Sequence, residues 1–225
     1  MTTYVILRNR IADDVRSVST AASSDISTQI AAEVLSAVAF YAREPFYFNT
    51  KTATFSTVAS QEYYSSSDLA DIATLVHIYT MTVTQNSVKM PVKPISFEAI
   101  NDSQTGQVVA RPTYYSYFKQ NIRLYPIPDA VYTMTMAYVY KLTALSADGD
   151  SNAWTTDAEE LIRARASRRL FENVVRNVER ATIAGAQEQE ALRALKRETR
   201  LRRSNDVLRV DDMLVTPTGY NIQIE

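Results

Sequence analysis

The sequence predicts an α+β protein: a helical bundle with a long C-terminal helix, a small and mostly antiparallel β-sheet, and an extended C-terminal arm. Both ends of the folded part carry apolar residues at helical spacing, whereas the middle alternates by twos. The last stretch returns to short apolar segments around Pro217 and Gly219. We expect residues 1–204 to form one domain and residues 205–225 to form the arm.

Two helices are predicted at the start of the chain, over residues 4–18 and 24–43. Each carries apolar residues at every third or fourth position, which gives it one face for a core. Ser23–Ser24–Asp25 supplies an N-cap for the second helix, and Pro45 forbids its continuation. We expect this helix pair to pack on the strands that follow.

A β-region is predicted over residues 46–142, with four to six strands joined by short links. Strands are expected at Thr52–Val58, from Leu75 to Val83 and around Tyr114–Phe118, and Ser96 is expected to cap a short helix. The tyrosines gather in this region without interleaved lysines and arginines. A core or interface role is therefore expected for them rather than base stacking.

The most regular alternation lies in Val131–Leu142, where both sets of side chains favour strands. We predict that this central strand is covered on both faces. A turn at Pro126–Asp129 is expected to pair it with Asn121–Tyr125 as a hairpin. Trp154 follows and is expected to fill a gap in the core.

One helix is predicted over residues 157–203. Thr156 and Glu159 form a capping box, and no proline interrupts the segment. At about 1.5 Å per residue such a helix is roughly 70 Å long, more than a small sheet can cover. Gly185 is the candidate for a hinge or a division. Part of the helix is therefore expected to contact another subunit.

Composition excludes several classes of function. The chain has no cysteine and one histidine, His77, which excludes disulfides and thiolate zinc sites and argues against His-rich metal centres. The formal net charge is −1, so bulk electrostatics does not indicate a nucleic-acid binder. No phosphate-binding glycine loop, membrane-spanning apolar run or signal pattern is found. We predict no cofactor, no metal and no membrane contact, and a soluble protein made in the cytoplasm.

Three sets of residues are candidates for a chemical role, and each also has a structural interpretation. His77 alternates with Leu75 and Tyr79, which favours a structural role in a strand. Glu33 and Glu44 are the candidate carboxylate pair of a glycosidase, but nothing in the sequence places them in one cleft. Asp148, Asp150 and Asn152 resemble a calcium loop only loosely, and a tight turn is favoured. No catalytic residue is predicted.

Seven residues are predicted to form a subunit or portal-binding interface. They are the basic Arg193, Arg197 and Arg200 of the last helix, and Met213, Leu214, Tyr220 and Ile222 of the arm. A solvated helix end is the simplest interpretation of the basic cluster, because positive charge suits a helix C-terminus. A subunit contact and a surface bordering DNA are the alternatives.

The order of several short segments resembles the head-to-tail adaptor (connector, or tail accessory) proteins of tailed bacteriophages. The resemblance covers roughly residues 7–175. It is carried by these segments: Leu7–Asp14, Phe46–Asn49, Ile122–Asp129 with Tyr132, Leu142–Ser146, Asn152–Trp154 and the helix from Leu161. Ala110–Arg111–Pro112 stands where the family has a glycine-x-proline turn.

The resemblance implies a structural virion protein and not an enzyme. Members form a ring, usually of twelve copies, beneath the portal, at the head–tail junction of particles assembled in the host cytoplasm. The ring extends the DNA channel, helps retain and eject the genome, and binds tail components such as a nozzle, hub or fibres. The packaged DNA passes through without sequence-specific binding, and a C-terminal arm reaches the portal.

Two alternatives to a ring-forming adaptor stay open. One is a tail-associated cell-wall hydrolase, which requires an acid and a nucleophile or base in one cleft. The other is a neighbouring virion part, a stopper or a short tail-tube component. The long helix favours the adaptor, because those parts are mostly β.

Overall fold

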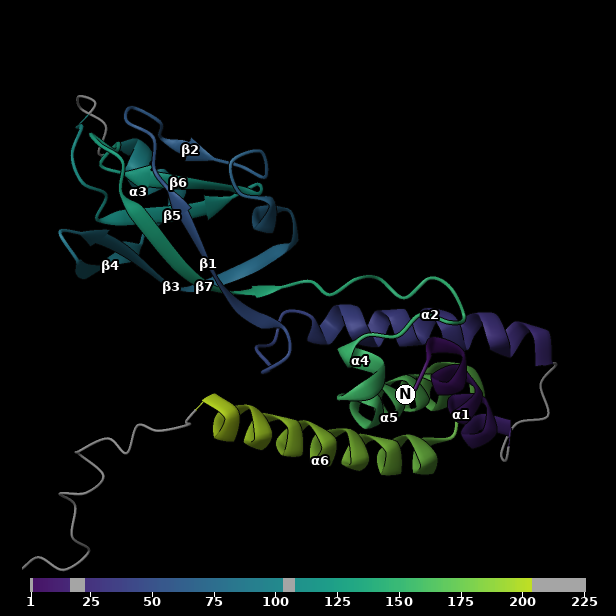
Figure 1. Cartoon of the computed structure of the whole chain (residues 1–225). Coiled ribbons are helices and arrows are strands. Elements are labelled where there is room, and N and C mark those ends of the chain that lie inside the picture. Colours follow the sequence, from purple (N-terminus) through teal and green to yellow (C-terminus); the bar gives the residue numbers. More distant parts are fainter. Residues whose placement is uncertain (1, 17–22, 103–107, 204–225) are drawn as a thin grey trace, which may run out of the picture.

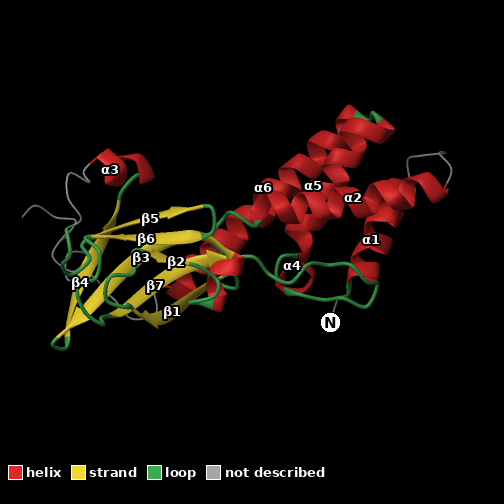
Figure 2. Ribbon diagram, turned by 90° about the horizontal axis from the view of Figure 1, so that it is seen from above, coloured by secondary structure: helices red, strands yellow, loops and turns green. Residues whose placement is uncertain are grey.

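The computed structural model describes residues 2–16, 23–102 and 108–203, and it confirms the α+β class. Figure 1 shows most of the helices gathered beside a curled sheet, and Figure 2 shows the same division from above. The helical elements are α1 (Tyr4–Arg16), α2 (Ser23–Tyr41), η1 (Ala70–Thr74), α3 (Phe97–Asp102), α4 (Ala153–Thr156), α5 (Glu159–Leu170), η2 (Phe171–Val175) and α6 (Val178–Arg203). The strands are β1 (Thr50–Ser56), β2 (Tyr63–Tyr64), β3 (Leu75–Gln85), β4 (Val88–Pro94), β5 (Tyr114–Phe118), β6 (Asn121–Tyr125) and β7 (Thr133–Tyr140).

The described part of the chain has two hydrophobic cores, one among the helices and one formed by the strands of the curled sheet. In the helical core, α5 lies between α2 and α6, with α1 beside it (Figure 1). Leu7, Ile30 and Ile162 are among its buried residues. The expectation that the first two helices pack on strands is wrong, because their apolar faces pack on α5. That residues 1–204 act as one domain stays a prediction.

Helix boundaries differ slightly from those predicted. Helix α1 reaches Arg16, and residues 17–22 lie outside the described part of the chain. Helix α2 ends at Tyr41, two residues before the predicted end, and the next residues form a turn that leads to Pro45. The side chains of residues 23–25 are not described, so their N-cap stays a prediction. The cap on α3 is confirmed, because the Ala99 amide donates to Ser96 Oγ at 3.2 Å.

The prediction of one helix over 157–203 is wrong. After α5 the chain makes the π-helical turn η2, and Arg176 then adopts a left-handed conformation with φ 55° and ψ 40°. The Asn177 side chain accepts a hydrogen bond from the Arg180 amide at 3.0 Å, and α6 begins. Helix α6 therefore folds back on α5, and its apolar stripe finds a partner within the same chain. The inference that its length requires another subunit no longer follows.

Gly185 does not divide the helix, since α6 continues through it. A Cβ atom at this position would lie 3.6 Å from Cδ of Arg168, an ordinary van der Waals contact, so the packing around Gly185 does not require a glycine. The capping box also lies elsewhere than predicted. Asn152 caps α4, where its Oδ1 accepts from the Trp154 amide at 2.9 Å and its own amide donates to Thr155 Oγ1 at 3.1 Å.

Replacing Arg176 with glycine is expected to raise the free energy of unfolding by about 1 kcal/mol. A left-handed conformation costs an L-residue roughly that much, and glycine adopts it without penalty. Urea denaturation of the two proteins measures the difference. The control is Arg180→Gly inside α6, which we expect to lower stability by about 1 kcal/mol. Loss of stability in Arg176→Gly would contradict the assignment of the turn.

The described strands form one sheet in the order β1-β7-β3-β4-β5-β6-β2, and only the short β4–β5 pair is parallel. Strand β4 is not predicted by the sequence, because Pro91 and Pro94 argue against a strand. Strand β4 forms because a tight turn folds the chain back against β3. Asn86 and Ser87 both have positive φ, which suits a two-residue hairpin turn between β3 and β4.

The predicted hairpin of Asn121–Tyr125 with Val131–Leu142 is wrong. Strand β6 pairs with β5 and β2, whereas β7 pairs with β1 and β3, at a distance along the sheet. The segment between β6 and β7 does not form a tight turn, because it is hydrogen-bonded to residues 108–110. The Ile127 amide donates to the Val108 carbonyl at 3.0 Å, and its carbonyl accepts from the Ala110 amide at 2.9 Å. These hydrogen bonds hold the connection along which the chain crosses from β6 to β7.

Strand β7 is central, as predicted, but its two faces are covered unequally. Met134, Met136 and Tyr138 are fully buried in the core of the sheet, whereas on the other face Val139 is buried and Thr135 and Ala137 are half-buried. Several tyrosines of the β-region lie in this core, which confirms their expected role: Tyr64, Tyr115, Tyr132 and Tyr138. The alternation in β7 therefore places every second side chain in the core. The side chains of the other face are mainly strand-forming residues that are less completely covered.

Candidate interaction surfaces

A buried acid joins three helices in the bundle. Glu188 of α6 is 5 % exposed, and its Oε1 accepts a hydrogen bond from the Tyr41 hydroxyl at 2.6 Å. Nη1 of Arg165 donates to the same oxygen at 2.7 Å, and Nη1 of Arg168 donates to Oε2 at 3.1 Å. The Arg165 guanidinium also lies 3.5 Å from the centre of the Phe40 ring. This network fixes α2, α5 and α6 relative to one another.

The protonation of these groups follows from their surroundings. Burial raises the pKa of the Glu188 carboxyl, but the hydrogen bonds from Tyr41, Arg165 and Arg168 outweigh it, so the pKa lies below its ordinary value. Burial and the hydrogen bond to Glu188 raise the pKa of the Tyr41 hydroxyl. Glu188 is therefore ionised and Tyr41 is neutral at neutral pH.

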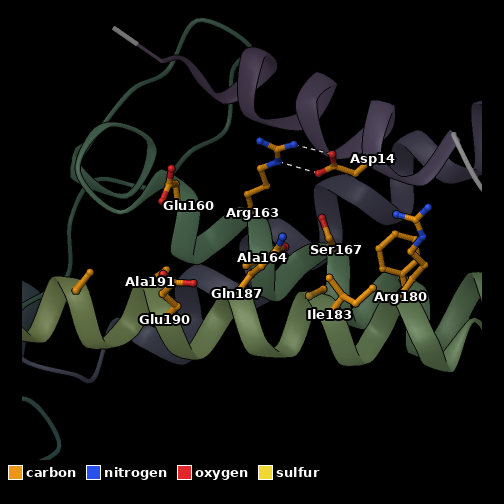
Figure 3. A pocket seen from close by; sticks show the side chains of 13 residues that line it. Asp14, Glu160, Arg163, Ala164, Ser167, Arg180, Ile183, Gln187, Glu190 and Ala191 are labelled. Carbon is orange, nitrogen blue, oxygen red and sulfur yellow. Dashed lines mark hydrogen bonds and ion pairs between the residues drawn. The ribbon is translucent and has the colours of Figure 1, made fainter.

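A groove runs between α1 and α6, and α5 forms its floor (Figure 3). Its volume is about 520 Å³. We call it the α1–α6 groove. The side chains on its floor are spaced four, three and four residues apart: Glu160, Ala164 and Ser167 of α5, and Phe171 at the start of η2. The α6 wall includes small and apolar residues, namely Ile183, Ala184, Ala191 and Ala194.

Charges lie at the two ends and along the upper wall of the groove. Glu160 and Glu190 lie toward one end and Arg180 toward the other (Figure 3). Asp14 and Arg163 form a bidentate salt bridge along the α1 wall, with N–O distances of 2.6 and 2.7 Å. The hydrogen bonds to Asp14 raise the pKa of the Arg163 guanidinium.

Ser167 is the unusual residue of this groove. It is 4 % exposed, and its hydroxyl oxygen has no hydrogen-bond partner among the described residues. A buried hydroxyl without a partner costs free energy. The hydroxyl is thus buried beneath the floor of the groove and is not part of its exposed surface.

The outward side of α2 forms a second unusual surface. Between Ile26 and Ala42 the only charged residue is Glu33, which pairs with Arg169 of α5 at 3.2 Å. We call this side the α2 outer face, and it consists of Thr28, Ala32, Leu35, Ser36, Ala39 and Arg43, all exposed. Leu35 is 43 % exposed. An exposed helix face normally carries charges, so this pattern indicates a contact.

The predicted basic residues lie together on α6. Arg193, Arg197 and Arg200 are spaced four and three residues apart, so they share one exposed side of the helix. None of them forms a salt bridge within the part of the chain that the structure describes. We call them the basic stripe. The other four predicted interface residues, Met213, Leu214, Tyr220 and Ile222, lie outside the described residues.

The candidate glycosidase carboxylates are not brought together. Glu33 pairs with Arg169 of α5, and Glu44 pairs with Lys196 of α6 at 3.1 Å. Glu33 lies eight residues, roughly 12 Å, before the end of α2, and Glu44 lies beyond that end, whereas catalytic pairs lie about 5–9.5 Å apart. Each carboxylate instead ties α2 or its end to another helix.

The other candidates for chemistry have structural surroundings. The Asp150 side chain accepts hydrogen bonds from the Ser146 and Ala147 amides, both at 2.7 Å, and these bonds lower its pKa. Asp148 pairs with Arg8. The segment is the tight turn that the sequence favours.

His77 lies in β3, but the predicted alternation around it is broken. Register shifts between β3 and β7 occur at Leu75/His77 and at Ile78/Thr80. As a result Ile78 is buried, and His77 is exposed with its ring edge-to-face on Tyr79 at 5.6 Å. A bulge of this kind leaves no signal in the spacing of apolar residues.

Sequence reasoning missed the α2 outer face, the α1–α6 groove and Glu188. The first has a visible signal, because a helix with a single charged residue in its long middle part is unusual for an exposed position. The groove and the Glu188 network have none, since both depend on α6 folding back on α5. Within the described ranges, no cluster of three metal-ligating side chains occurs and no helix has the length and apolarity to span a membrane.

Comparison with models of protein families gives a match. Residues 2–211 match a family described as SU10 adaptor protein, so nearly the whole chain is covered. A search of curated proteins found no match.

Proposed function

We propose, since the chain belongs to the SU10 adaptor protein family, that it forms a ring under the portal of a tailed bacteriophage. In that position it joins head to tail, extends the DNA channel and helps retain and eject the genome. The family match is the observation that carries this proposal. The matched residues, 2–211, contain both cores, the α2 outer face and the basic stripe, so the match extends over all the proposed surfaces except the end of the C-terminal segment. The family is one of structural phage proteins and not of enzymes.

A closed ring requires a head-to-tail contact between two different surfaces of each copy. The α2 outer face and the α1–α6 groove supply two such surfaces in the helical core. Twelve copies, the usual number in proteins that this chain resembles, are proposed here as well. The packaged DNA passes through the ring without sequence-specific contacts, which suits a chain of net charge −1.

Two further regions are proposed to contact the portal or a neighbouring copy. The exposed basic stripe of Arg193, Arg197 and Arg200 provides positive charge that no salt bridge neutralises among the residues that the structure describes. The segment 205–225 provides apolar side chains at Met213, Leu214, Tyr220 and Ile222. We propose that this segment binds the portal by strand addition or by filling a groove. Tail proteins such as a nozzle, hub or fibres bind the opposite side of the ring.

Mixing the purified chain with portal rings is expected to give a second stacked ring in electron micrographs. Deletion of residues 205–225 is expected to abolish this stacking and to leave the far-UV circular dichroism of the folded part unchanged. A control substitution far from this segment in the sequence, Lys119→Gln, removes one exposed charge from the turn after β5 and is expected to stack normally. Portal binding by the truncated chain would contradict the role of the segment, and absence of any stacked ring with the intact chain would contradict the function.

The hydrolase alternative has no support from the described site geometry, because Glu33 and Glu44 hold separate salt bridges far apart.

A further inference from the structure

The α2 outer face and the α1–α6 groove lie on opposite sides of α5. Groove residues Glu160 and Ser167 lie on one side of that helix. Arg169, which pairs with Glu33 of α2, is nine positions after Glu160 and so points the opposite way, at about 100° per residue. Two unlike surfaces on opposite sides of one bundle are what a head-to-tail ring requires.

We infer that the α2 outer face of one copy docks in the α1–α6 groove of the next copy. This inference rests on the proposed ring and names its subunit contact. The occupant is a second copy of the chain because its chemistry fits the groove. Thr28, Ala32, Leu35 and Ala39 bring no charge to a floor that contains Ala164, Ser167 and Phe171. Small side chains also allow the helix to approach the floor closely.

Charge sets the direction of the docked helix. Arg43 at the end of the α2 outer face is exposed, and neither Glu160 nor Glu190 forms a salt bridge among the described residues. Pairing Arg43 with these two acids places α2 of the neighbour antiparallel to α5. The α2 helix already packs antiparallel on α5 within its own chain, where Glu33 meets Arg169 and Phe40 meets Arg165.

This direction fixes a register that can be tested. Ala39 lies four residues before Arg43, and Gln187 lies three residues before Glu190 on the groove wall. At about 1.5 Å per residue these positions are roughly level. The same register places polar Ser36 of the incoming helix level with Ser167 on the groove floor, since each lies seven residues from the charged end of its own helix.

The test uses the absence of cysteine from the sequence. A full-length chain with Ala39→Cys and Gln187→Cys is assembled, with portal rings where needed, oxidised and run on a non-reducing gel. We expect a ladder of covalent oligomers. A bond within one chain is excluded, because α5 lies between the two positions and a disulfide needs Cα atoms within about 7 Å.

The matched control pairs Ala39→Cys with Gln189→Cys. Gln189 is also an exposed glutamine, but it lies two residues from Gln187 and so faces about 160° away on the same helix. We expect no ladder from this chain. A mixture of the two single-cysteine chains, Ala39→Cys and Gln187→Cys, is expected to stop at covalent dimers.

Three results overturn the inference. Rings that form without a ladder, or with equal ladders in both double variants, show that this contact is not the docking site and leave the proposed ring intact. A bond from Gln187→Cys to a cysteine placed within residues 204–225 shows that the C-terminal segment occupies the groove instead. If the unmodified chain stays monomeric with and without portal rings, the proposed ring fails and this contact fails with it.

Discussion

Replacing Trp154 with alanine is expected to lower the free energy of unfolding by about 4 kcal/mol, the usual cost of truncating a buried tryptophan. Trp154 is 1 % exposed and is the largest fully buried side chain among the described residues. Its ring meets Phe48 edge-on at 5.0 Å and Phe46 at 5.8 Å. These aromatic residues come from the two connections between the sheet and the bundle, so the cavity opens where the two cores are joined.

The measurement is urea denaturation followed by far-UV circular dichroism, because Trp154 is the only tryptophan and its loss removes the fluorescence signal. Trp154→Phe is the control. It keeps an aromatic ring against Phe46 and Phe48 and is expected to cost about 1–2 kcal/mol. A cost below about 1 kcal/mol for Trp154→Ala would show that the aromatic cluster collapses around the cavity.

Replacing Glu188 with alanine is expected to destabilise the protein by about 3 kcal/mol, because it leaves the buried charge of Arg165 without its partner. The Tyr41 hydroxyl loses its acceptor in the same variant. Assembly should suffer as well, since the network holds α2 and α6, which carry the two proposed docking surfaces. Equilibrium denaturation gives the change in stability, and electron micrographs with portal rings give the change in assembly.

Glu198→Ala is the matched control in the same helix. Glu198 pairs with Arg202 at 2.6 Å, but both side chains are largely exposed, so the expected change is within about 0.5 kcal/mol. Equal effects of the two substitutions would contradict the role assigned to Glu188.

The pH dependence of Glu188 has a definite sign. Its pKa in the folded protein lies below the ordinary value of 4.5, so its contribution to stability is complete above that value. The contribution is lost as the pH falls through the lowered pKa. The difference in unfolding free energy between the wild type and Glu188→Gln should therefore be constant above about pH 5 and shrink in more acidic solution.

The sequence alone determined the type of the longer elements, because local rules decide it, whereas β2, β4, α4 and η2 were not predicted. Apolar residues at helical spacing marked α1 and α2, alternation marked β3 and β7, and Pro45 marked the end of a helix. The sequence also carried the family resemblance, which the match over residues 2–211 confirms. The exposed position of the basic stripe followed from its spacing on α6.

Only the tertiary structure decided how these elements pair. No composition signal marks Arg176, because its left-handed conformation is held by the packing of α6 on α5 and not by its own preference. Strand partners are also non-local: β6 and β7 are neighbours in the chain and distant in the sheet, since the amides between them bond to a third segment. The groove, its position opposite the α2 outer face and the Glu188 network all follow from such long-range contacts, which spacing along the chain does not encode.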